Sequence, residues 1–445
     1  MQEPATSAAR VLMGDSLGFH IIFVLFGLTL PVLVSWFEFM GIRRKDKRLI
    51  NIAHFWSKIM AVLVIAGVIS GTVIALQMSL VWPGILKFGG EVIGLPFMFE
   101  TYAFIIEAVF LGLYMKTWNS KRVSQWVHWL YGLGIVLGST LSAYAITSIN
   151  GWMNLPTGFT IVSGKFENIS VLKAMFSRTA LVEFFHSMAG YYIAASLALA
   201  GLYLIKLARA KYKDRVGSAH TLDWFVVQKL LIFAALAFVV TAVTADLTGK
   251  YLAKYEPEKL AAIELVYETT DRAPLIIGGV AGANNTIVGP YFKIPSALSI
   301  LAGNSPNTVV KGLNEVPKDK RPPLVVHTLY DIKMTLMDVM VAAAVAYFVA
   351  KKWRPKLLKK RLTLVLLAVS FFFGIILVEL GWMLTEIGRQ PWAVRGYLTT
   401  AEAVTKTHDI TSFGYVFPAA YVVLFAVTVL AVRRIVRGET KGVQS

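Results

Sequence analysis

Long apolar stretches alternate with shorter polar connections along the chain. Nine of these stretches reach the roughly 20 residues that an α-helix needs to cross about 30 Å of hydrocarbon. They lie near residues 17–40, 56–80, 95–117, 126–149, 180–207, 223–245, 329–350, 361–386 and 414–436. The first is too long for a signal-peptide core, so we take it as a membrane helix. The pattern predicts an all-α protein, a polytopic membrane helix bundle with about nine transmembrane helices.

One connection is much longer than the others. Residues 246–328 contain many Gly, Pro and Asn and open with a charged segment. A loop of this length is usually either functional or disordered. We therefore expect three parts: transmembrane helices one to six in 1–245, an outer loop in 246–328, and helices seven to nine with a tail in 329–445.

Composition supports an integral membrane protein and narrows the choice of metal ligands. The chain is 56% hydrophobic and 16% charged, with a mean hydropathy of +0.62, and is thus far more apolar than a soluble domain. It contains no Cys, which excludes disulfides, iron–sulfur clusters and thiolate-bound haem or zinc. Metal ligands would have to come from the seven His, the fourteen Met and the carboxylates.

The basic residues behind the net charge of +18 are distributed as in a membrane protein. Of the 44 Lys and Arg, 25 fall in alternate connections, at residues 43–58, 116–122, 206–215, 351–361 and 433–441. By the positive-inside rule these connections face the cytoplasm. We therefore expect a cell-membrane protein with its amino terminus outside and its carboxyl terminus in the cytoplasm. We expect no nucleic-acid partner, because the basic residues do not gather on one soluble face.

Four side chains from four different helices fall in one layer beneath the outer surface: His20, His186, Met334 and Glu386. Imidazole and thioether are the axial ligands of a six-coordinate electron-transfer haem, and a single His or carboxylate suits a haem with an open position. Simpler interpretations are a hydrogen-bonded packing His, a core Met, and an ion pair of Glu386 with Arg389. The residues alone leave these alternatives open.

The third helix carries Glu100 and Glu107, which are seven residues apart and so share a face. Glu107 lies about halfway across the bilayer. A carboxylate at that depth without an obvious cationic partner is expected to be protonated or to relay protons. Hydroxyl side chains at 139–144 of the fourth helix either continue a polar path or only bond to backbone carbonyls.

The segment from Glu256 to Glu264 predicts a short amphipathic helix. Pro257 stands at its start, and its first turn contains acidic residues. Lys259 and Glu264 are about 140° apart around such a helix and are not expected to pair. Solvated surface is the simplest interpretation of this segment. The other His lie near predicted helix ends or in loops and receive no role: His54, His128, His220, His327 and His408.

Two motifs resemble subunit I of the cytochrome bd family of quinol oxidases. One is Gly-Arg-Gln-Pro-Trp at 388–392, preceded by Gly-Trp at 381–382 and by Glu386. The other is Lys-Leu-Ala-Ala-Ile-Glu at 259–264, which is similar to the quinol-binding loop of that family. Weaker matches surround these motifs, and the resemblance runs from about residue 18 to residue 392.

The resemblance implies three haems near the outer face. His186 and Met334 would ligate a low-spin haem b. His20 and Glu386 would be axial ligands of the two remaining haems, a high-spin haem b and an oxygen-binding haem that is either haem d or a third haem b. The resemblance does not decide which of His20 and Glu386 serves which haem.

It also implies residues that act beside the haems. Glu107 would carry protons toward the oxygen site or contact its iron, and Glu100 would share this role. The family spaces these glutamates eight apart and this chain seven, so Glu100 matches only after a shift of one residue. Trp382 and Arg389 would line the haem pocket.

Lys259 and Glu264 would bind quinol and accept its protons at the outer surface, while O2 is reduced to water with cytoplasmic protons. The outer loop would be of the family's short kind. A second large membrane subunit is implied, with small single-helix subunits as a further option. Rival interpretations are a haem b-only relative, a quinol oxidoreductase with another acceptor, and a haem-free proton-coupled transporter.

Overall fold

The computed structural model describes residues 2–212, 220–406 and 410–442. Within these ranges nine helices are long and apolar enough to cross a membrane, as predicted. They are α1 Gln2–Arg44, α2 Lys47–Val81, α3 Pro83–Thr117, α4 Gln125–Asn154, α6 Arg178–Arg209, α8 Thr221–Tyr255, α11 Val325–Trp353, α12 Arg361–Arg389 and α14 Ile410–Gly442.

Several helices extend beyond the apolar stretches that predict them. α1 begins at Gln2, well before residue 17, and α8 continues past residue 245 to Tyr255. A helix bonds its own backbone, so it can leave the hydrocarbon without ending, and hydropathy marks only its apolar part. The division at 245 and 328 stays a prediction. Lys213, Arg215 and His408 lie outside the described residues.

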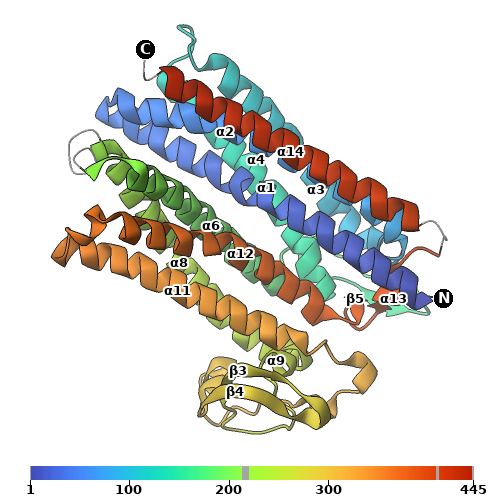
Figure 1. The fold of residues 1–445 in the computed structure, drawn as a ribbon. Coiled ribbons are helices and arrows are strands. Elements are labelled where there is room, and N and C mark those ends of the chain that lie inside the picture. The colour runs from blue at the N-terminus through green and yellow to red at the C-terminus, as the bar shows by residue number, and fades with distance from the viewer. Residues whose placement is uncertain (1, 213–219, 407–409, 443–445) are drawn as a thin grey trace. The chain divides into compact units, whose positions relative to one another are not determined.

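The helices gather into two compact units. The first consists of Met1–Trp152, Pro156–Ala180 and Ala401–Ser445, and the second of Met153–Leu155 and Leu181–Thr400. Within the first unit, α1 packs along α2, and α14 contacts both (Figure 1). Within the second unit, α11 lies along α12 (Figure 1).

Glycines on α4 set its distance from α3 in the first unit. A Cβ added at Gly138 would lie 2.7 Å from the backbone nitrogen of Glu107, and one at Gly134 would lie 2.3 Å from the Phe110 ring. Small residues four apart let two membrane helices approach closely. The backbone that carries Glu107 is therefore packed directly against α4.

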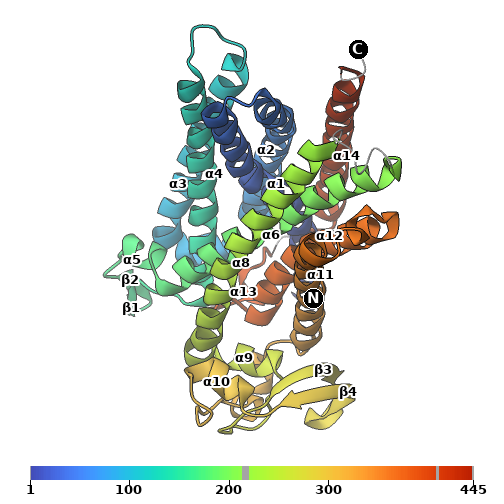
Figure 2. The same cartoon turned by 90° about the vertical axis from the view of Figure 1, so that its left-hand side faces the viewer.

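The segment between α8 and α11 is ordered, and it lies at one end of those helices (Figure 2). It contains α9 Pro257–Ile263, β3 Leu275–Ala281, η2 Ala283–Asn285, β4 Ile287–Ile294, α10 Ala297–Gly303, η3 Leu313–Glu315 and η4 Lys318–Lys320. β3 and β4 form an antiparallel ribbon. Leu260, Leu298 and Leu313 belong to a buried core of this segment, to which α12 adds Leu384. The segment is thus a small folded module.

Short elements complete the described part of the chain. They are the hairpin β1 Thr160–Val162 and β2 Lys165–Glu167, the helix α5 Val171–Met175, the turn η5 Leu357–Lys359, the hairpin β5 Trp392–Val394 and β6 Leu398–Thr399, and the helix α13 Thr400–Ala403. The strands add to the predicted all-helical bundle without changing its class.

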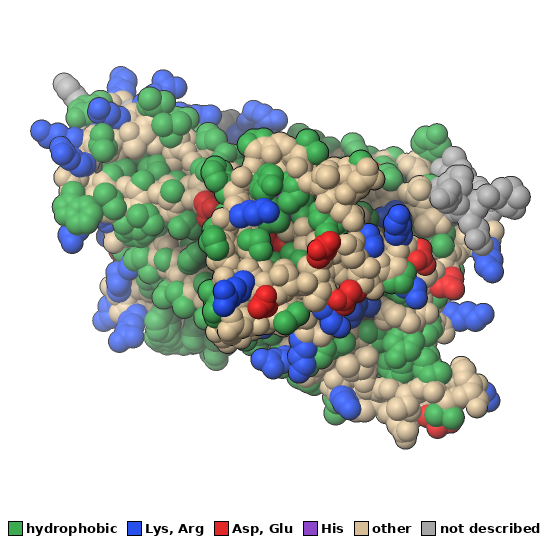
Figure 3. Space-filling view, turned by 90° about the horizontal axis from the view of Figure 1, so that it is seen from below, with side chains coloured by type: hydrophobic (Ala, Val, Ile, Leu, Met, Phe, Trp, Pro, Cys, Tyr) green, Lys and Arg blue, Asp and Glu red, His purple; other side chains and the backbone are tan. Residues whose placement is uncertain are grey.

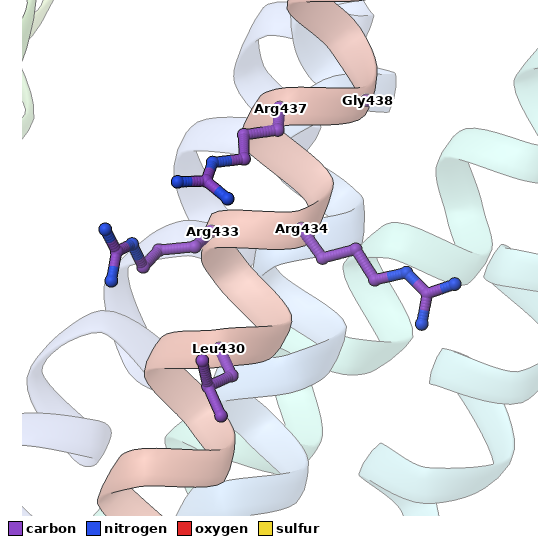
Figure 4. Close-up of a pocket in the computed structure, with 5 residues that line it drawn as sticks. All are labelled: Leu430, Arg433, Arg434, Arg437 and Gly438. Atoms are coloured by element: carbon purple, nitrogen blue, oxygen red, sulfur yellow. The ribbon is translucent and has the colours of Figure 1, made fainter.

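Charges of both signs lie among exposed hydrophobic side chains on the face that Figure 3 shows, seen from the end that carries β3 and β4. The last turns of α14 are more uniformly basic. Arg433 and Arg437 project to one side of the helix and Arg434 to the other, around a surface pocket that Leu430 and Gly438 also line (Figure 4). A cytoplasmic position for these arginines stays a prediction.

Candidate functional site

Thr244 on α8 holds the ring of His186 on α6. His186 Nδ1 lies 3.0 Å from Thr244 Oγ1, and the same hydroxyl lies 2.8 Å from the carbonyl oxygen of Val240. A hydroxyl has one proton and a carbonyl only accepts, so Thr244 donates to Val240 and accepts from His186 Nδ1. His186 Nε2 is then left with the lone pair that an iron ligand needs.

His20 has the same arrangement within the first unit. Its Nδ1 lies 2.8 Å from Ser70 Oγ, which donates to the carbonyl oxygen of Gly67 at 3.0 Å. By the same argument His20 Nε2 carries a lone pair. Gly71 lies beside the ring, where an added Cβ would be 3.3 Å from His20 Cε1. Both predicted His ligands therefore present the nitrogen that can bind a metal.

Met334 is half-buried on α11, and its neighbour Lys333 points about 100° away from it around the helix. The stem of Lys333 passes Gly381 of α12, where an added Cβ would be 4.0 Å from Lys333 Cε. Lys333 also lies within electrostatic range of His186. The second unit therefore brings α6, α11 and α12 together around Lys333, and a place for Met334 beside His186 stays a prediction.

Arg389 is the centre of a buried polar cluster at the end of α12. It pairs with Glu386, and its Nη1 donates to Asn154 Oδ1 at 3.1 Å. Asn154 Nδ2 in turn donates to Glu183 Oε1 at 2.8 Å. The ion pair of Glu386 with Arg389, which sequence offers as the simpler interpretation, is present, and the ligand role of Glu386 stays a prediction. The buried Nε of Arg389 has no partner among the described residues, and a free guanidinium N–H of this kind fits an anionic group such as a haem propionate.

Trp382, the other residue expected to line a haem pocket, donates from Nε1 to Glu379 Oε2 at 2.7 Å. The second oxygen of Glu379 is buried without a partner in the described part of the chain. The part of the chain that the structure describes contains no group of three or more His, Cys, Asp or Glu that could hold a bare metal ion. One or two axial ligands are enough for a haem, so the donors in both units fit that group.

Gly388 makes room for Lys259. A Cβ added at Gly388 would lie 2.8 Å from Lys259 Cε and 3.2 Å from its Cγ. The ammonium of Lys259 lies 3.3 Å from Glu256 Oε2, and both side chains are buried. The glycine of the 388–392 motif thus accommodates a residue of the 259–264 motif, which links the two sequence signatures in space.

Gly388→Ala tests the expectation, implied by the resemblance, that Lys259 binds quinol. The new methyl group has to displace a buried, paired side chain, and overpacking of this kind costs about 1–3 kcal/mol. We expect the quinol KM to rise about tenfold with little change in kcat, measured as initial rates of quinol oxidation. Gly112→Ala is the control, because its added Cβ meets nothing within 4 Å. Equal KM values in the two variants would contradict this role.

The segment 256–264 corrects one expectation. α9 forms as predicted, with Pro257 at its start, but Lys259, Leu260 and Ile263 are buried, so the segment is not solvated surface. Lys259 pairs with Glu256 and not with Glu264, as the helix geometry requires. Glu258 instead pairs with Arg395 at 2.6 Å. The charged side chains of α9 are thus held by partners inside the second unit.

Glu264 follows α9 and is only 1% exposed. Its Oε2 accepts from the backbone nitrogen of Ile276 at 3.4 Å. Burial raises the pKa of Glu264 to about 8; the hydrogen bond from Ile276 opposes the shift and the charge of Asp331 adds to it. Leu265 takes a left-handed conformation, φ +48°, that L-residues rarely adopt. The carboxyl group is therefore held in place and suited to exchange protons near neutral pH.

A pocket of about 330 Å³ lies in the same module, and its lining includes neighbours of Glu264 but not Glu264 itself. Two residues next to Glu264 line this pocket. Leu265 follows Glu264 in the sequence, and the backbone nitrogen of Ile276 donates to its carboxylate. Tyr267 and Tyr291 add aromatic faces, and Lys293 adds a charge. The lining suits a flat, partly polar ring.

Glu100 and Glu107 share one face of α3, as their spacing predicts. Glu107 is 5% exposed, and Glu100 is half-buried. The hydroxyls of α4 serve the backbone: Ser139 donates to Ile135 at 3.0 Å, and Tyr144 donates to Met175 at 3.0 Å. The simpler of the two interpretations for Ser139 and Tyr144 is confirmed.

The first unit contains a buried polar cluster that was not predicted from the sequence. His128 Nδ1 lies 2.6 Å from Glu38 Oε1, and Tyr114 donates to Glu38 Oε2 at 2.6 Å. All three side chains are buried. Glu38 and His128 are ninety residues apart in the chain, so no local motif could have revealed the pair. Tyr114 lies on the same buried face of α3 as Glu107.

The comparisons with known proteins agree on one family. The family model for the cytochrome bd terminal oxidase subunit I matches residues 8–440. A Bacillus subtilis (strain 168) protein, provisionally named cytochrome bd menaquinol oxidase subunit I, is 33% identical over 95% of this chain and 94% of its own length. Cytochrome bd ubiquinol oxidase subunit 1 of the same strain is 27% identical over 97% and 93%. The solved bd oxidase of Geobacillus thermodenitrificans is 36% identical, with a TM-score of 0.90 over 97% of this chain and 98% of that one.

Proposed function

The chain belongs to the cytochrome bd terminal oxidase subunit I family, and from this membership we propose how its residues divide the work of a terminal quinol oxidase. The protein is a multi-pass membrane subunit of a quinol:oxygen oxidoreductase. The proposal is carried by one observation above all: two imidazoles each give Nδ1–H to a hydroxyl and keep Nε2 for a metal.

We assign the haem ligands as the motifs predict. His186 and Met334 would hold a low-spin haem b, and His20 and Glu386 would each serve one of two further haems, a high-spin haem b and a haem d or third haem b. Bound haem supplies the one-electron chemistry that connects quinol with O2. Arg389 supports the assignment, because its unpartnered Nε suits a haem carboxylate.

Quinol would bind at Lys259 and Glu264 on the outer side of the membrane. Lys259 supplies a buried cation and Glu264 a buried carboxyl group, and the pocket in the same module could take a quinol ring. In its ionised form Glu264 would accept a proton as quinol is oxidised. An outward position for this segment is part of the proposal.

Quinol oxidation is expected to speed up as pH rises through the pKa of Glu264. With a pKa of about 8, the carboxyl group is mostly protonated at about pH 6 and mostly ionised at about pH 9, and only the ionised form can take a proton. We expect kcat/KM for quinol, corrected for enzyme-free oxidation, to rise across this range with a midpoint near 8. Glu264→Gln should remove the rise together with most of the activity. A flat wild-type profile would count against the assignment.

Protons for water formation would come from the cytoplasm through the first unit. Glu107, with Glu100 as a second carboxyl group, would pass them toward the oxygen site. Tyr114, Glu38 and His128 support such a path, because they extend the buried polar face of α3 toward the helix end that carries Lys116. Water formation would then take protons from the cytoplasm, and quinol oxidation would release protons on the outer side. Together these two reactions would separate charge across the membrane.

The subunit I designation of the family supports a second large membrane subunit as partner, and small single-helix subunits are a further proposal. Exposed hydrophobic side chains on the long helices, such as Leu236, Val239 and Leu366, suit contact with lipid or with such a partner.

The reduced-minus-oxidised absorption spectrum of the purified protein tests this function against its rivals. We expect haem b bands together with a haem d band far to the red, or haem b bands alone if the third haem is haem b. Rapid O2 uptake with quinol separates an oxidase from a quinol oxidoreductase with another acceptor. A colourless protein without bound tetrapyrrole would leave a proton-coupled transporter as the better interpretation.

A further inference from the structure

The free edge of β3 is capped by two carboxylates. Ile276 and Gly278 are two residues apart, so their N–H groups point the same way, about 7 Å from one another. Ile276 donates to Glu264 Oε2 at 3.4 Å, and Gly278 donates to Asp331 Oδ2 at 2.6 Å. β4 pairs with the other edge. The strand therefore holds Glu264 and Asp331 side by side.

The two carboxylates differ in their access to water. Glu264 is 1% exposed, whereas the side chain of Asp331 is 16% exposed. A buried ionised carboxylate is costly, and one in contact with water is much less so. Asp331 is therefore the one of the two acids that meets solvent.

His327 holds this pair of acids in position. It is fully buried, its Nδ1 lies 2.6 Å from the carbonyl oxygen of Ile263, and its Nε2 lies 3.2 Å from that of Gly278. Carbonyl oxygens only accept, so the ring acts as a donor in these contacts. Asp331 Oδ2 also lies 3.4 Å from Nε2.

The ring thus ties the end of α9, directly before Glu264, to the strand that Asp331 caps. Tyr330 lies within electrostatic range of both acids. Among the described residues, His327, Tyr330 and Glu264 are ionisable groups that interact with Asp331.

We propose that Asp331 receives the proton that Glu264 takes from quinol and releases it to the outer water, with His327 as the residue that positions both acids. The inference rests on the proposed quinol role of Glu264. Quinol gives up two electrons and two protons. The electrons would go to the haems that the proposed ligands would hold, and each proton passes from quinol to the Glu264 carboxylate, through water to the Asp331 carboxylate, and then to solvent. Both carboxylates return to their starting state.

Asp331→Asn tests the route, since Asn keeps an oxygen for Gly278 but cannot carry the proton. We expect kcat with quinol to fall at least tenfold and the quinol KM to stay within about twofold. Oxidation of tetramethyl-p-phenylenediamine, which gives up an electron without releasing a proton, should be unchanged. Proton release to the outer medium, followed with a pH indicator in a single turnover, should slow in parallel with kcat. Asp338→Asn, an exposed acid on the same helix, is the matched control.

Two results would overturn the inference: quinol turnover of Asp331→Asn equal to that of Asp338→Asn, or an equal loss with both electron donors, which would indicate general damage. Asp331→Ser covers the case in which the Asn variant does not assemble. Added formate should restore its quinol turnover in proportion to concentration, and an absence of rescue would also overturn the inference.

Glu264→Gln separates the inference from the function on which it rests. Wild-type quinol turnover in this variant would overturn the proposed quinol role, and the proton route with it. Lost turnover in Glu264→Gln with normal turnover in Asp331→Asn would overturn only the route through Asp331.

Discussion

Replacing His186 with Ala is expected to remove the low-spin haem signal and spare the signal of the oxygen site. Alanine offers no nitrogen to iron, and Met334 alone is a weak ligand. Quinol oxidation should fall to near background, because electrons would lose their entry point. The measurement is the reduced-minus-oxidised spectrum together with the haem content per protein. Retention of both haem signals would refute the assignment of His186.

Thr244→Val provides a graded version of the same experiment. Valine keeps the shape of threonine but cannot accept from His186 Nδ1, and loss of such an outer partner typically weakens metal binding 10- to 100-fold. Thr241→Val on the same helix is the matched control, because within the described part of the chain that hydroxyl bonds only to the carbonyl oxygen of Ala237, at 3.3 Å. Equal haem retention in the two valine variants would show that the hydroxyl of Thr244 does not support the ligand.

Replacing Glu107 with Gln is expected to slow turnover about a hundredfold while haem content stays near that of the wild type. Gln fills the same space against Gly138 but cannot exchange a proton as a carboxyl group does, and such groups contribute roughly 10²–10⁴ in rate. O2 uptake at saturating quinol measures the loss, and Glu107→Ala should behave similarly.

Glu91→Gln, an exposed residue of the same helix, should turn over normally and serves as control. Unchanged O2 uptake in Glu107→Gln would end the relay proposal.

Hydropathy predicted the long helices because a chain in hydrocarbon has to bond its own backbone, which makes the apolar stretch and the helix nearly the same thing. That argument does not hold outside the membrane. The ribbon of β3 and β4 contains paired glycines at 278–279 and only loose alternation, so its segment resembles an unstructured loop in sequence. Its order comes from contacts with α9, α10 and the end of α11.

Candidate site residues could be predicted where they lie in a contiguous motif. They could not be predicted where their role depends on contacts with residues far away in the chain. Lys259, Glu264 and Arg389 lie in recognisable runs. The burial of Lys259 was not predictable, because Gly388, which makes room for it, lies more than a hundred residues further along the chain. His327 looked like an ordinary residue at a helix start, since its acceptor at Ile263 is 64 residues away.

If His20 and His186 hold haem iron, as proposed above, their hydroxyl partners have a consequence for its reduction potential. A carboxylate beside Nδ1 would draw the ring proton toward itself, give the ring imidazolate character and favour ferric iron. Ser70 and Thr244 are uncharged acceptors, so both rings stay neutral donors. We therefore expect reduction potentials higher than those of haems whose histidine is paired with an acid, which suits centres that pass electrons onward to O2.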